Sequence, residues 1–506
     1  MPLPAGRGGS LTALVLGLDQ GTSSTRCLAL DRELAIRGVG SVAVGASFPG
    51  PGLVEQDPEE LVASASEAIE AALRSAGVPA RDVIALGIAN QTETFVVAER
   101  ESGRAIHPAI VWQDRRTAER CDALRDAGHA DTVRARTGLE LDPTFPASKL
   151  GWLLDHVDGA RRAAAAGELV YLDVAGWLIR RSAGGELCEA SNAGRTLLCA
   201  LGATDWDEQL LELFGVPRAM LPPIVDTDGV ERVTADGLRI AAVLGDQQAS
   251  LFGLGCRTPG AAKVTLGTGA FILAHAGHAR PSPPPGVLGS CAWRLGGRSS
   301  YALEGFVPAA GAALDWFSEL GVIPAAAELD PLLAEADAGA DGALVCVPAL
   351  QGLGTPSWDA GVAGSLLGVT RATTRPQLAR AVLDGVLHQV VDALEAIAAA
   401  TALNSVLLDG GMSRSDRVAA RLAELAGVEV RRAVRGEATA IGAAMLAGLS
   451  AGFWSGPDEF VETATDLVAV PRMCGEQRAA LRERWAEAVR VVGAWRPDQN
   501  SGRRAS

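Results

Sequence analysis

Short apolar runs alternate along the chain with longer segments in which apolar residues recur every three or four positions. The short runs predict strands at 13–18, 83–89, 240–244, 263–266, 343–347 and 405–408. The longer segments have the period of an amphipathic helix and predict helices at 59–75, 115–127, 376–400, 415–426 and 437–449. Strands that alternate with helices in this way are typical of an α/β fold.

Two of the predicted helices carry further local signals. At the start of the first, Asp57 is placed as the N-cap, Pro58 at the first helical position and Glu60 at the third. The helix at 376–400 has one apolar face, formed by Leu378, Val382, Val386, Val390, Leu394 and Ile397. Both patterns strengthen the helical interpretation.

One pattern occurs twice, about half a chain apart. The segment 14–30 has two apolar runs joined by a turn that contains Gly21 and Thr22, and the segment 264–273 has the same arrangement around 267–269. Each reads as a β-hairpin with a Gly-Thr tip, which suggests two halves of related design.

Glycine and proline cluster between residues 252 and 262, and we place the boundary between the two halves there. We therefore expect an N-terminal domain at 11–254 and a C-terminal domain at 260–495. The length of 506 residues has room for two to four domains, at roughly 100–200 residues per domain.

Composition narrows the class of protein. The chain has 45 basic and 60 acidic residues, a net charge of −15, which argues against non-specific binding to nucleic acid or to a membrane surface. No apolar run reaches the roughly 18 residues that span a bilayer. The apolar run at 11–18 leads directly into Asp19 without a small-residue cleavage site, so it reads as a strand and not as a signal peptide. Only Lys149 and Lys263 are lysines, and this preference for arginine is more typical of genome composition than of a function.

The cysteines and histidines indicate no metal site. The 8 cysteines are scattered without a Cys-x-x-Cys pair, which predicts buried free thiols in a reducing compartment, and hence a cytoplasmic protein. His275 and His278 are the one close histidine pair, and we expect them in a solvated loop beside the proline-rich stretch rather than on zinc.

The first hairpin tip is a candidate phosphate site. Gly21 allows a tight turn whose N–H groups converge, and hydroxyls and a positive charge follow in the order Thr22, Ser23, Ser24 and Arg26. Asp19 would repel phosphate unless a magnesium ion lay between them, so it suggests Mg²⁺. The alternative is a plain β-turn, in which these residue types are common.

Two further turns bear on phosphate binding. The second Gly-Thr hairpin at 267–269 favours it, because two such loops can hold a phosphate chain from two sides. The turn at Asp409-Gly410-Gly411 allows a flat ligand to approach the backbone, although taken alone it favours a simple strand-to-helix turn. Neither lysine follows a glycine, which excludes a Walker A loop, and protein-kinase and dinucleotide-binding patterns are absent.

Polar residues at two other strand ends suggest a substrate site. Asp246 follows the strand at 240–244 and could accept a proton from a substrate hydroxyl; the alternative is an N-cap for a helix at 247–254. The segment 90–94, Asn-Gln-Thr-Glu-Thr, follows another strand and could bind hydroxyls, or be a polar loop. Trp112 and Phe271 could form apolar walls, although most such rings simply fill cores.

Taken together, these motifs resemble the FGGY carbohydrate kinase family, in order and over nearly the whole chain. The matching segments are 18–26, 54–58, 90–94, 109–117, 245–248, 267–269, 301–305, 352–359, 408–411 and 438–444. Within the family they are most similar to members that phosphorylate glycerol. The resemblance implies two actin-like (ribonuclease H-like) ATPase domains, with ATP and substrate in the cleft between them.

The resemblance also implies roles for particular residues. Asp246 would be the general base and Asp19 would help to hold Mg²⁺. Outer phosphates would meet Thr22, Ser23, Ser24 and Arg26, with Thr268 opposite, and Gly311 and Gly411 would lie against the nucleotide. The positions that match polyol contacts are Glu93, Trp112, Asp246, Gln247 and Phe271.

Four positions depart from the family pattern. Thr92 replaces an arginine and Thr144 a tyrosine or similar ring of the polyol site, so we expect a wider pocket unless another arginine arrives from elsewhere in the chain. On the nucleotide side, Asp315 replaces a glutamine and Ser415 a frequent asparagine. The segment 226–240 lacks the longer Gly-rich insert with which some bacterial members bind fructose 1,6-bisphosphate.

The sequence therefore predicts an ATP- and Mg²⁺-dependent kinase that phosphorylates a primary hydroxyl of a small polyol, with glycerol first. One alternative is a related kinase for a tetritol, a pentitol or a ketose. Two others are an actin- or Hsp70-like ATPase and a sugar-sensing regulator without catalysis. Glu93, Trp112 and Phe271 argue against the ATPase, and Asp246 with Asp19 against the regulator. The sequence leaves homo-oligomer formation open.

Overall fold

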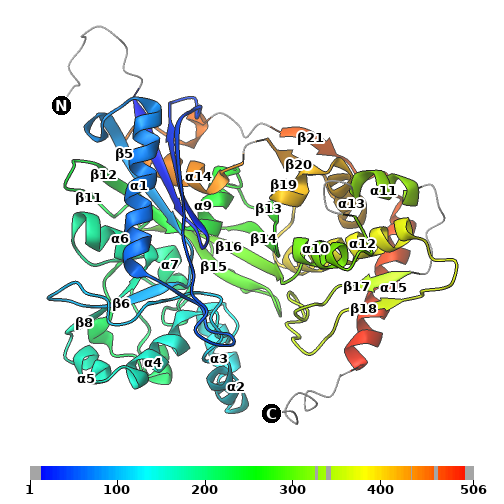
Figure 1. Cartoon of the computed structure of the whole chain (residues 1–506), viewed down its shortest axis with the longest axis horizontal. Coiled ribbons are helices and arrows are strands. Elements are labelled where there is room, and N and C mark those ends of the chain that lie inside the picture. The colour runs from blue at the N-terminus through cyan, green and yellow to red at the C-terminus, as the bar shows by residue number, and fades with distance from the viewer. Residues whose placement is uncertain (1–12, 325–328, 338–343, 435, 461–464, 496–506) are drawn as a thin grey trace, which may run out of the picture.

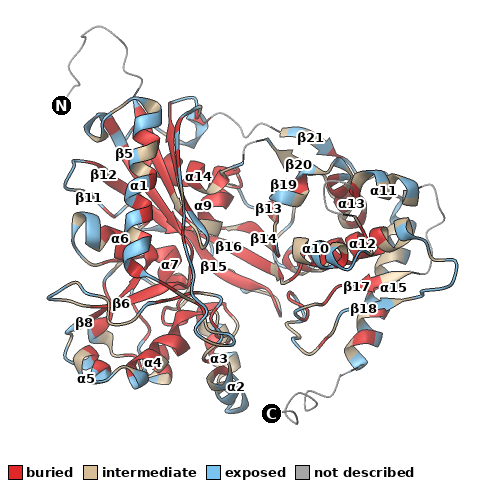
Figure 2. Cartoon of the chain, viewed as in Figure 1, coloured by how far each residue is buried: buried red, intermediate tan, exposed pale blue. Residues whose placement is uncertain are grey.

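The computed structural model describes residues 13–324, 329–337, 344–434, 436–460 and 465–495. These residues form two lobes, with strands of the second half of the chain lying between them (Figure 1). Apolar side chains fill the interior of both lobes, where the ribbon is coloured as buried (Figure 2).

A six-stranded sheet forms the first lobe, in the order β11-β12-β5-β1-β2-β3. Its strands are β1 (Leu14–Gln20), β2 (Ser24–Leu30), β3 (Ile36–Ala43), β5 (Val83–Asn90), β11 (Arg232–Val233) and β12 (Arg239–Gly245). The central strands β1, β5 and β12 are parallel, so their carboxyl ends meet at one edge. Helix α1 (Pro58–Ala76), capped by Asp57 as expected, packs against β2 and β3.

A seven-stranded sheet forms the second lobe, in the order β15-β16-β14-β13-β19-β20-β21. Its strands are β13 (Ala261–Leu266), β14 (Ala270–Gly277), β15 (Leu288–Leu295), β16 (Arg298–Val307), β19 (Ser405–Asp409), β20 (Val430–Ala433) and β21 (Thr465–Ala469). The helices of this lobe are α10 (Gly311–Glu319), α11 (Leu329–Asp337), α12 (Arg375–Ala398), α13 (Asp416–Ala426) and α15 (Gly475–Ala494). Five of the six apolar residues predicted for the face of α12 are buried, and the sixth, Leu378, is half-buried.

A four-stranded sheet with surrounding short helices extends the first lobe below the main sheet. Its strands are β4 (Glu55–Gln56), β6 (Phe95–Glu99), β7 (Ala109–Ile110) and β8 (Leu169–Asp173). The helices are α2 (Ala118–Asp126), α3 (Ala130–Thr137), α4 (Pro146–His156), α5 (Ala160–Ala165), α6 (Val174–Ala183), α7 (Ala190–Gly194) and α8 (Glu208–Phe214). Two short pairs remain, β9 (Cys188–Glu189) with β10 (Ile224–Val225) and β17 (Val345–Val347) with β18 (Ser365–Leu367).

One helix of the second half packs on the sheet of the first. Helix α14 (Ala438–Ser450) lies across β1 and β5 and beside α9 (Asp246–Gly253). The approach is close because four glycines leave room for it. A Cβ at Gly17 or Gly87 would overlap a carbonyl oxygen of α14, and one at Gly442 would overlap the Ala249 carbonyl oxygen of α9; the fourth is Gly253. The two halves are thus joined by backbone contact.

The predicted elements are present with small shifts in their ends. The helix expected at 115–127 begins at Ala118, and residue 343 of the strand expected at 343–347 lies outside the described residues. Both predicted hairpins form, β1 with β2 and β13 with β14. No described helix is long and apolar enough to cross a membrane.

The expectation for the histidine pair was wrong for His275. This residue lies in β14 and is buried against the ring of Trp293, with 5.3 Å between ring centroids, while His278 is exposed. The strand runs to Gly277, beyond its most apolar segment, and residues 272–275 are all buried, so both faces of the strand are covered at His275. The eight cysteines are free thiols, and all but Cys474 are buried.

Candidate active site

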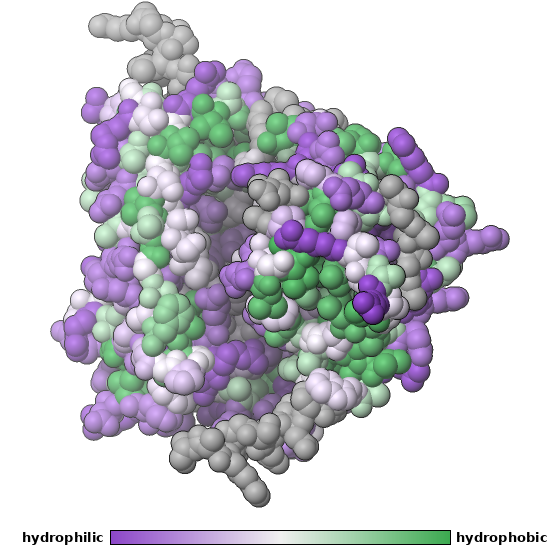
Figure 3. Space-filling view, turned by 45° about the vertical axis from the view of Figure 1, so that its right-hand side comes forward, coloured by the Kyte–Doolittle hydropathy of each residue, from purple (hydrophilic) through white to green (hydrophobic). Residues whose placement is uncertain are grey.

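The candidate site lies where the carboxyl ends of β1, β5 and β12 meet the second lobe. Figure 3 shows the surface hollowed between the lobes, with hydrophilic side chains bordering the hollow. The parallel register pairs Asp19 with Ala89, and Gly245 with Asn90. Asp19, the polar segment after Asn90 and Asp246 therefore come together at one sheet edge, as the strand-end pattern predicts.

Three hydrogen bonds hold the first hairpin tip in place, one within the turn and two from other parts of the chain. The N–H of Gly21 donates to the Ser24 carbonyl at 3.0 Å, which closes the turn. The Thr22 carbonyl accepts from Gln56 Nε2 at 2.7 Å, and the Thr22 hydroxyl accepts from the indole N–H of Trp112 at 3.0 Å. Ser23 and Ser24 remain exposed at the tip, with their hydroxyls open to a ligand.

Charges beside this hairpin are unbalanced. Arg26 pairs with Glu437 at 2.9 Å, and its Nε is buried without an acceptor among the described residues. Burial, together with the charges of Asp246 and Glu437, raises the pKa of Asp19 to about 8, while the charge of Arg26 acts to lower it. The Arg26 Nε without an acceptor suits a bound anion, and the half-buried Asp19 carboxyl beside two other carboxylates suits a bound cation.

The second hairpin rests on the first turn of α10. The N–H of Gly311 donates to the Gly267 carbonyl at 2.8 Å, and the Thr268 carbonyl accepts from the N–H groups of Ala310 and Ala312. A Cβ at Gly311 would lie 2.6 Å from the Gly267 oxygen, so a larger residue would push the hairpin away. Thr268 itself is exposed at the tip.

At the third turn, Asp409-Gly410-Gly411, the backbone lies close to the end of β13. Gly410 has φ 91°, and a Cβ there would overlap the backbone of Leu266 at the end of β13. Gly411 follows, exposed and with open space around it. Ser415 caps α13 by accepting from the Val418 N–H at 3.2 Å and also donates to Asp330, and Asp315 is exposed on α10.

Asp246 is the first residue of α9, and the N-cap is Gly245. The alternative that Asp246 serves as the N-cap is therefore wrong. Its carboxylate accepts from the Gln247 N–H at 2.7 Å. Burial and the charge of Glu93 raise the pKa of Asp246 to about 6, while the Gln247 N–H, Lys263 and Arg195 act to lower it. A carboxylate with a pKa near the working pH is suited to general-base catalysis.

Thr92 and Thr144 both point their side chains at neighbouring protein groups. A Cβ on Gly245 would lie 2.6 Å from the Thr92 methyl, so Thr92 packs against the strand end that carries Asp246. The Thr144 hydroxyl donates to Asp142 Oδ1 at 2.6 Å.

Arg195, an arginine that the sequence analysis did not place at the site, lies beside Glu93. Its Nε donates to Glu93 at 2.6 Å and its Nη1 to Glu304 at 2.6 Å. The guanidinium lies over the ring of Phe145, 5.3 Å from its centroid. Glu93 is buried and has φ 62°, the left-handed region that side chains rarely adopt. Such strain in a buried carboxylate is typical of a functional position.

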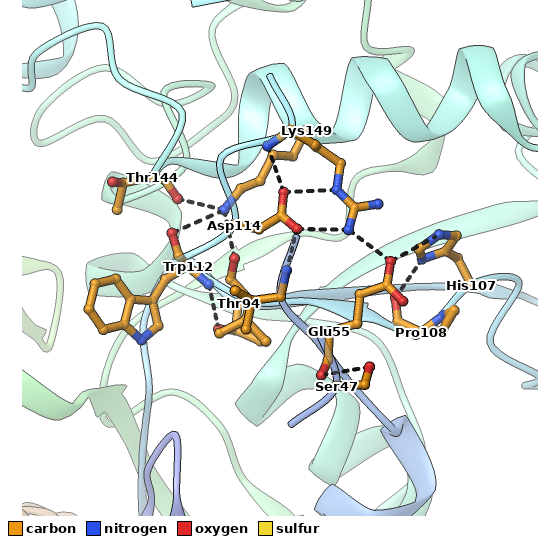
Figure 4. Close-up of polar contacts among 12 residues, drawn as sticks. Ser47, Glu55, Thr94, His107, Pro108, Trp112, Asp114, Thr144 and Lys149 are labelled. Carbon is orange, nitrogen blue, oxygen red and sulfur yellow. Dashed lines mark hydrogen bonds and ion pairs between the residues drawn. The ribbon is translucent and has the colours of Figure 1, made fainter. Parts of the chain in front are cut away.

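Lys149 supports the wall that carries Trp112 and Thr144 (Figure 4). Its buried ammonium donates to the carbonyls of Thr144 at 2.8 Å, Val111 at 3.0 Å and Trp112 at 3.5 Å. Burial lowers the pKa of Lys149 to about 7. Farther along the same wall, Arg116 bridges Asp114 and Glu55. Glu55 in turn reaches His107, as the close-up shows.

Lys263 connects the two lobes at the site. From β13 it donates to Gln247 Oε1 at 2.9 Å and to the Thr265 hydroxyl at 3.0 Å. Phe271, on the paired strand β14, packs against Phe306 with 5.0 Å between ring centroids. Gln247 and Phe271 are thus held by partners that the sequence analysis did not name.

The sequence analysis missed the residues that fix the site residues in place. These are Gln56, Lys149, Arg195, Lys263, Glu304 and Glu437. One signal was available, because the chain has only two lysines and both are buried at this site. In a chain that otherwise uses arginine, a buried lysine marks a place where a compact ammonium is required.

Comparison with known proteins agrees with this geometry. The profile described as "FGGY family of carbohydrate kinases, N-terminal domain" matches residues 14–253, and the corresponding C-terminal domain matches 262–451. A glycerol kinase of Aromatoleum aromaticum is 44% identical over 492 residues, 95% of this chain and 99% of that protein. A glycerol kinase of Thermus brockianus is 43% identical over 490 residues, again 95% and 99%.

Solved structures show the same fold. The glycerol kinase of Plasmodium falciparum, solved with ADP, has a TM-score of 0.90 and 25% identity over 95% of this chain and 98% of that one. A xylulose kinase of Rhodospirillum rubrum has a TM-score of 0.83 at 24% identity, over 95% and 99%, which supports the fold alone. The expected pair of actin-like domains is therefore confirmed.

The family profiles cover both halves of the chain, and the relatives match it almost from end to end. The sheet edge, the two Gly-Thr hairpins and the half-buried aspartate after β12 lie in the matched regions. This protein belongs to the FGGY family of carbohydrate kinases.

Proposed function

We propose that this kinase transfers the terminal phosphoryl group of ATP to a primary hydroxyl of glycerol, with Mg²⁺ as the metal. The observation that carries the proposal is Asp246, a half-buried carboxylate with a raised pKa at the meeting point of both lobes. Phosphoryl transfer asks little of the protein beyond positioning, charge stabilisation and a proton acceptor for the attacking hydroxyl. Asp246 supplies the acceptor. The glycerol kinases at 41–44% identity support the substrate.

The polyol would lie between Asp246 and the wall formed by Trp112 and Phe271. Glu93 offers a carboxylate and Gln247 an amide, and both are oriented by ion pairs or hydrogen bonds to other residues. A charged acceptor forms a stronger hydrogen bond to a hydroxyl than a neutral one does. We therefore expect Glu93 to contribute most to substrate binding.

The phosphates would lie between the two hairpin tips. Ser23, Ser24 and Thr268 are exposed there, and the free Nε of Arg26 is a ready donor to an anion. Gly411 leaves room for the nucleotide beside the second hairpin, and Gly311 would lie against it where α10 meets that hairpin. For Asp315 and Ser415 we propose contact with the nucleotide through the surface of α10 and the start of α13.

Asp19 fits a magnesium site. Its carboxyl is crowded by Asp246 and Glu437, and a divalent cation would relieve that crowding. The described residues contain no group of three or more acidic, histidine or cysteine ligands, and Mg²⁺ commonly binds through one or two carboxylates with phosphates and water. When bound with ATP, the ion would neutralise charge on the phosphates. We also propose a cytoplasmic location, supported by the buried free thiols.

A substrate panel tests the choice of glycerol. Because Arg195 supplies a guanidinium beside Glu93, we expect the site to hold a three-carbon polyol in spite of Thr92 and Thr144. ADP release should then give the highest kcat/KM with glycerol among glycerol, erythritol, threitol, the pentitols and ketoses. A tetritol, pentitol or ketose with a higher kcat/KM would show that the two threonines widen the pocket, and the substrate assignment would be wrong.

A further inference from the structure

Arg195 makes the strongest contact to a residue of the proposed polyol site. Both of its ion pairs, to Glu93 and to Glu304, measure 2.6 Å, and the three side chains expose only 12%, 6% and 8% of their surface. A planar guanidinium can hold two carboxylates at fixed angles, which a lysine ammonium cannot. The orientation of Glu93 is therefore set by Arg195.

The backbone that presents Arg195 is tied to the strand ends of the site. Arg195 follows α7, in which the Asn192 side chain exchanges two hydrogen bonds with Asn90 at the end of β5, at 3.0 and 3.1 Å. The Ser191 hydroxyl accepts from the Gly245 N–H at 2.9 Å, directly before Asp246. These hydrogen bonds fix the backbone before Arg195 relative to the ends of β5 and β12.

Glu304 anchors the other side of the guanidinium in the second half of the chain. It lies in β16, accepts from Gln248 Nε2 at 3.2 Å and accepts from the Ser290 hydroxyl of β15. The two Glu304 oxygens are therefore both occupied. In Glu93, Oε1 is occupied by Arg195, and nothing in the described part of the chain bonds to Oε2.

We propose that Arg195 is a positioning residue for polyol binding, which holds Glu93 with one oxygen turned to the substrate and is itself anchored across the two halves by Glu304. The inference rests on the proposed function, because it takes Glu93 as the carboxylate that receives a substrate hydroxyl. Arg195 acts through Glu93, so its removal loosens the polyol and leaves the nucleotide site alone.

A double-mutant cycle tests this role. Arg195→Met, Glu93→Gln and the combined variant are compared in the full chain for KM of glycerol, KM of ATP and kcat. Each single variant should raise the KM of glycerol by about 10–100-fold, the worth of one hydrogen bond from a charged group, with the KM of ATP changed less than about 3-fold. The KM of glycerol for the combined variant should exceed that of Glu93→Gln alone by no more than about 3-fold, because the effects of residues that act as a unit are not additive.

Two further variants separate positioning from folding. Arg195→Lys keeps the charge but loses the fork, and should give an intermediate KM. If Arg195→Met fails to fold, the charge-balanced variant Arg195→Met/Glu304→Gln replaces it, because it leaves no second unpaired carboxylate. An unchanged KM for glycerol in the folded variant, or additive effects of Arg195→Met and Glu93→Gln, would overturn the proposal. Lack of glycerol turnover by the unmodified protein would instead refute the proposed function.

Discussion

Replacement of Asp246 by asparagine is expected to lower kcat for glycerol phosphorylation by about 10²–10⁴-fold, the usual contribution of a positioned general base. Asparagine keeps the shape and can still accept from the Gln247 N–H, but it cannot take the proton of the attacking hydroxyl. The phosphate hairpins and the turn at Gly411 do not depend on Asp246, so ATP binding should survive.

The measurement is single-turnover kinetics together with nucleotide binding by titration calorimetry. Asp82→Asn, at an exposed position before β5, is the matched control and should behave as the unmodified protein. Activity of the unmodified protein should also fall as the pH drops through about 6, because a protonated Asp246 cannot accept a proton. Near-normal turnover by Asp246→Asn would mean that another group is the base.

The largest effect on stability is expected from Gly442→Ala. A Cβ at this position of α14 would overlap the Ala249 carbonyl oxygen of α9, and neither atom can rotate away, because the Cβ is fixed on its Cα and the oxygen on helical backbone. The two helices must separate, and overpacking of this kind costs about 3 kcal/mol. Because α14 joins the second half of the chain to the first sheet, the loss should reach both lobes.

The control for this variant is a second helical glycine. Gly493, in α15, has open space around its Cβ direction, and alanine there should be neutral or stabilise by up to about 1 kcal/mol. Compared with the unmodified protein, the midpoint of thermal unfolding should be several degrees lower for Gly442→Ala and should not be lower for Gly493→Ala. Equal midpoints for the two variants would show that α14 and α9 can adjust without cost.

Local patterns explain why the hairpins and strand ends were predictable from sequence. A turn at Gly21 or Gly267 is encoded by the few residues around it, and the carboxylate of Asp246 directly follows a recognisable strand. The packing of α14 on β1 was not predictable in this way, because it depends on Gly17, which lies more than 400 positions before the helix. His275 was misplaced for a related reason, since its burial depends on the packing of β14 against β16 and against helices on the sheet.

The supporting contacts of the site could not be read from sequence for the same physical reason. Arg195 meets Glu304 across 109 positions, and Lys149 meets the Val111 carbonyl across 38. A backbone carbonyl carries no residue-type signal, so the role of Lys149 has no motif. The departures at Thr92 and Thr144 were visible in the sequence, but the ion pair of Arg195 with Glu93 was visible only in the fold.

The most direct test of the account is the stoichiometry of the reaction with ATP, Mg²⁺ and glycerol, followed by phosphorus NMR. The account predicts that ADP and a phosphate ester of glycerol form in equal amounts, that ADP formation depends on glycerol, and that chelation of Mg²⁺ stops both. Formation of ADP and inorganic phosphate at a rate that glycerol does not change would contradict it, and would indicate an ATPase without a small-molecule acceptor.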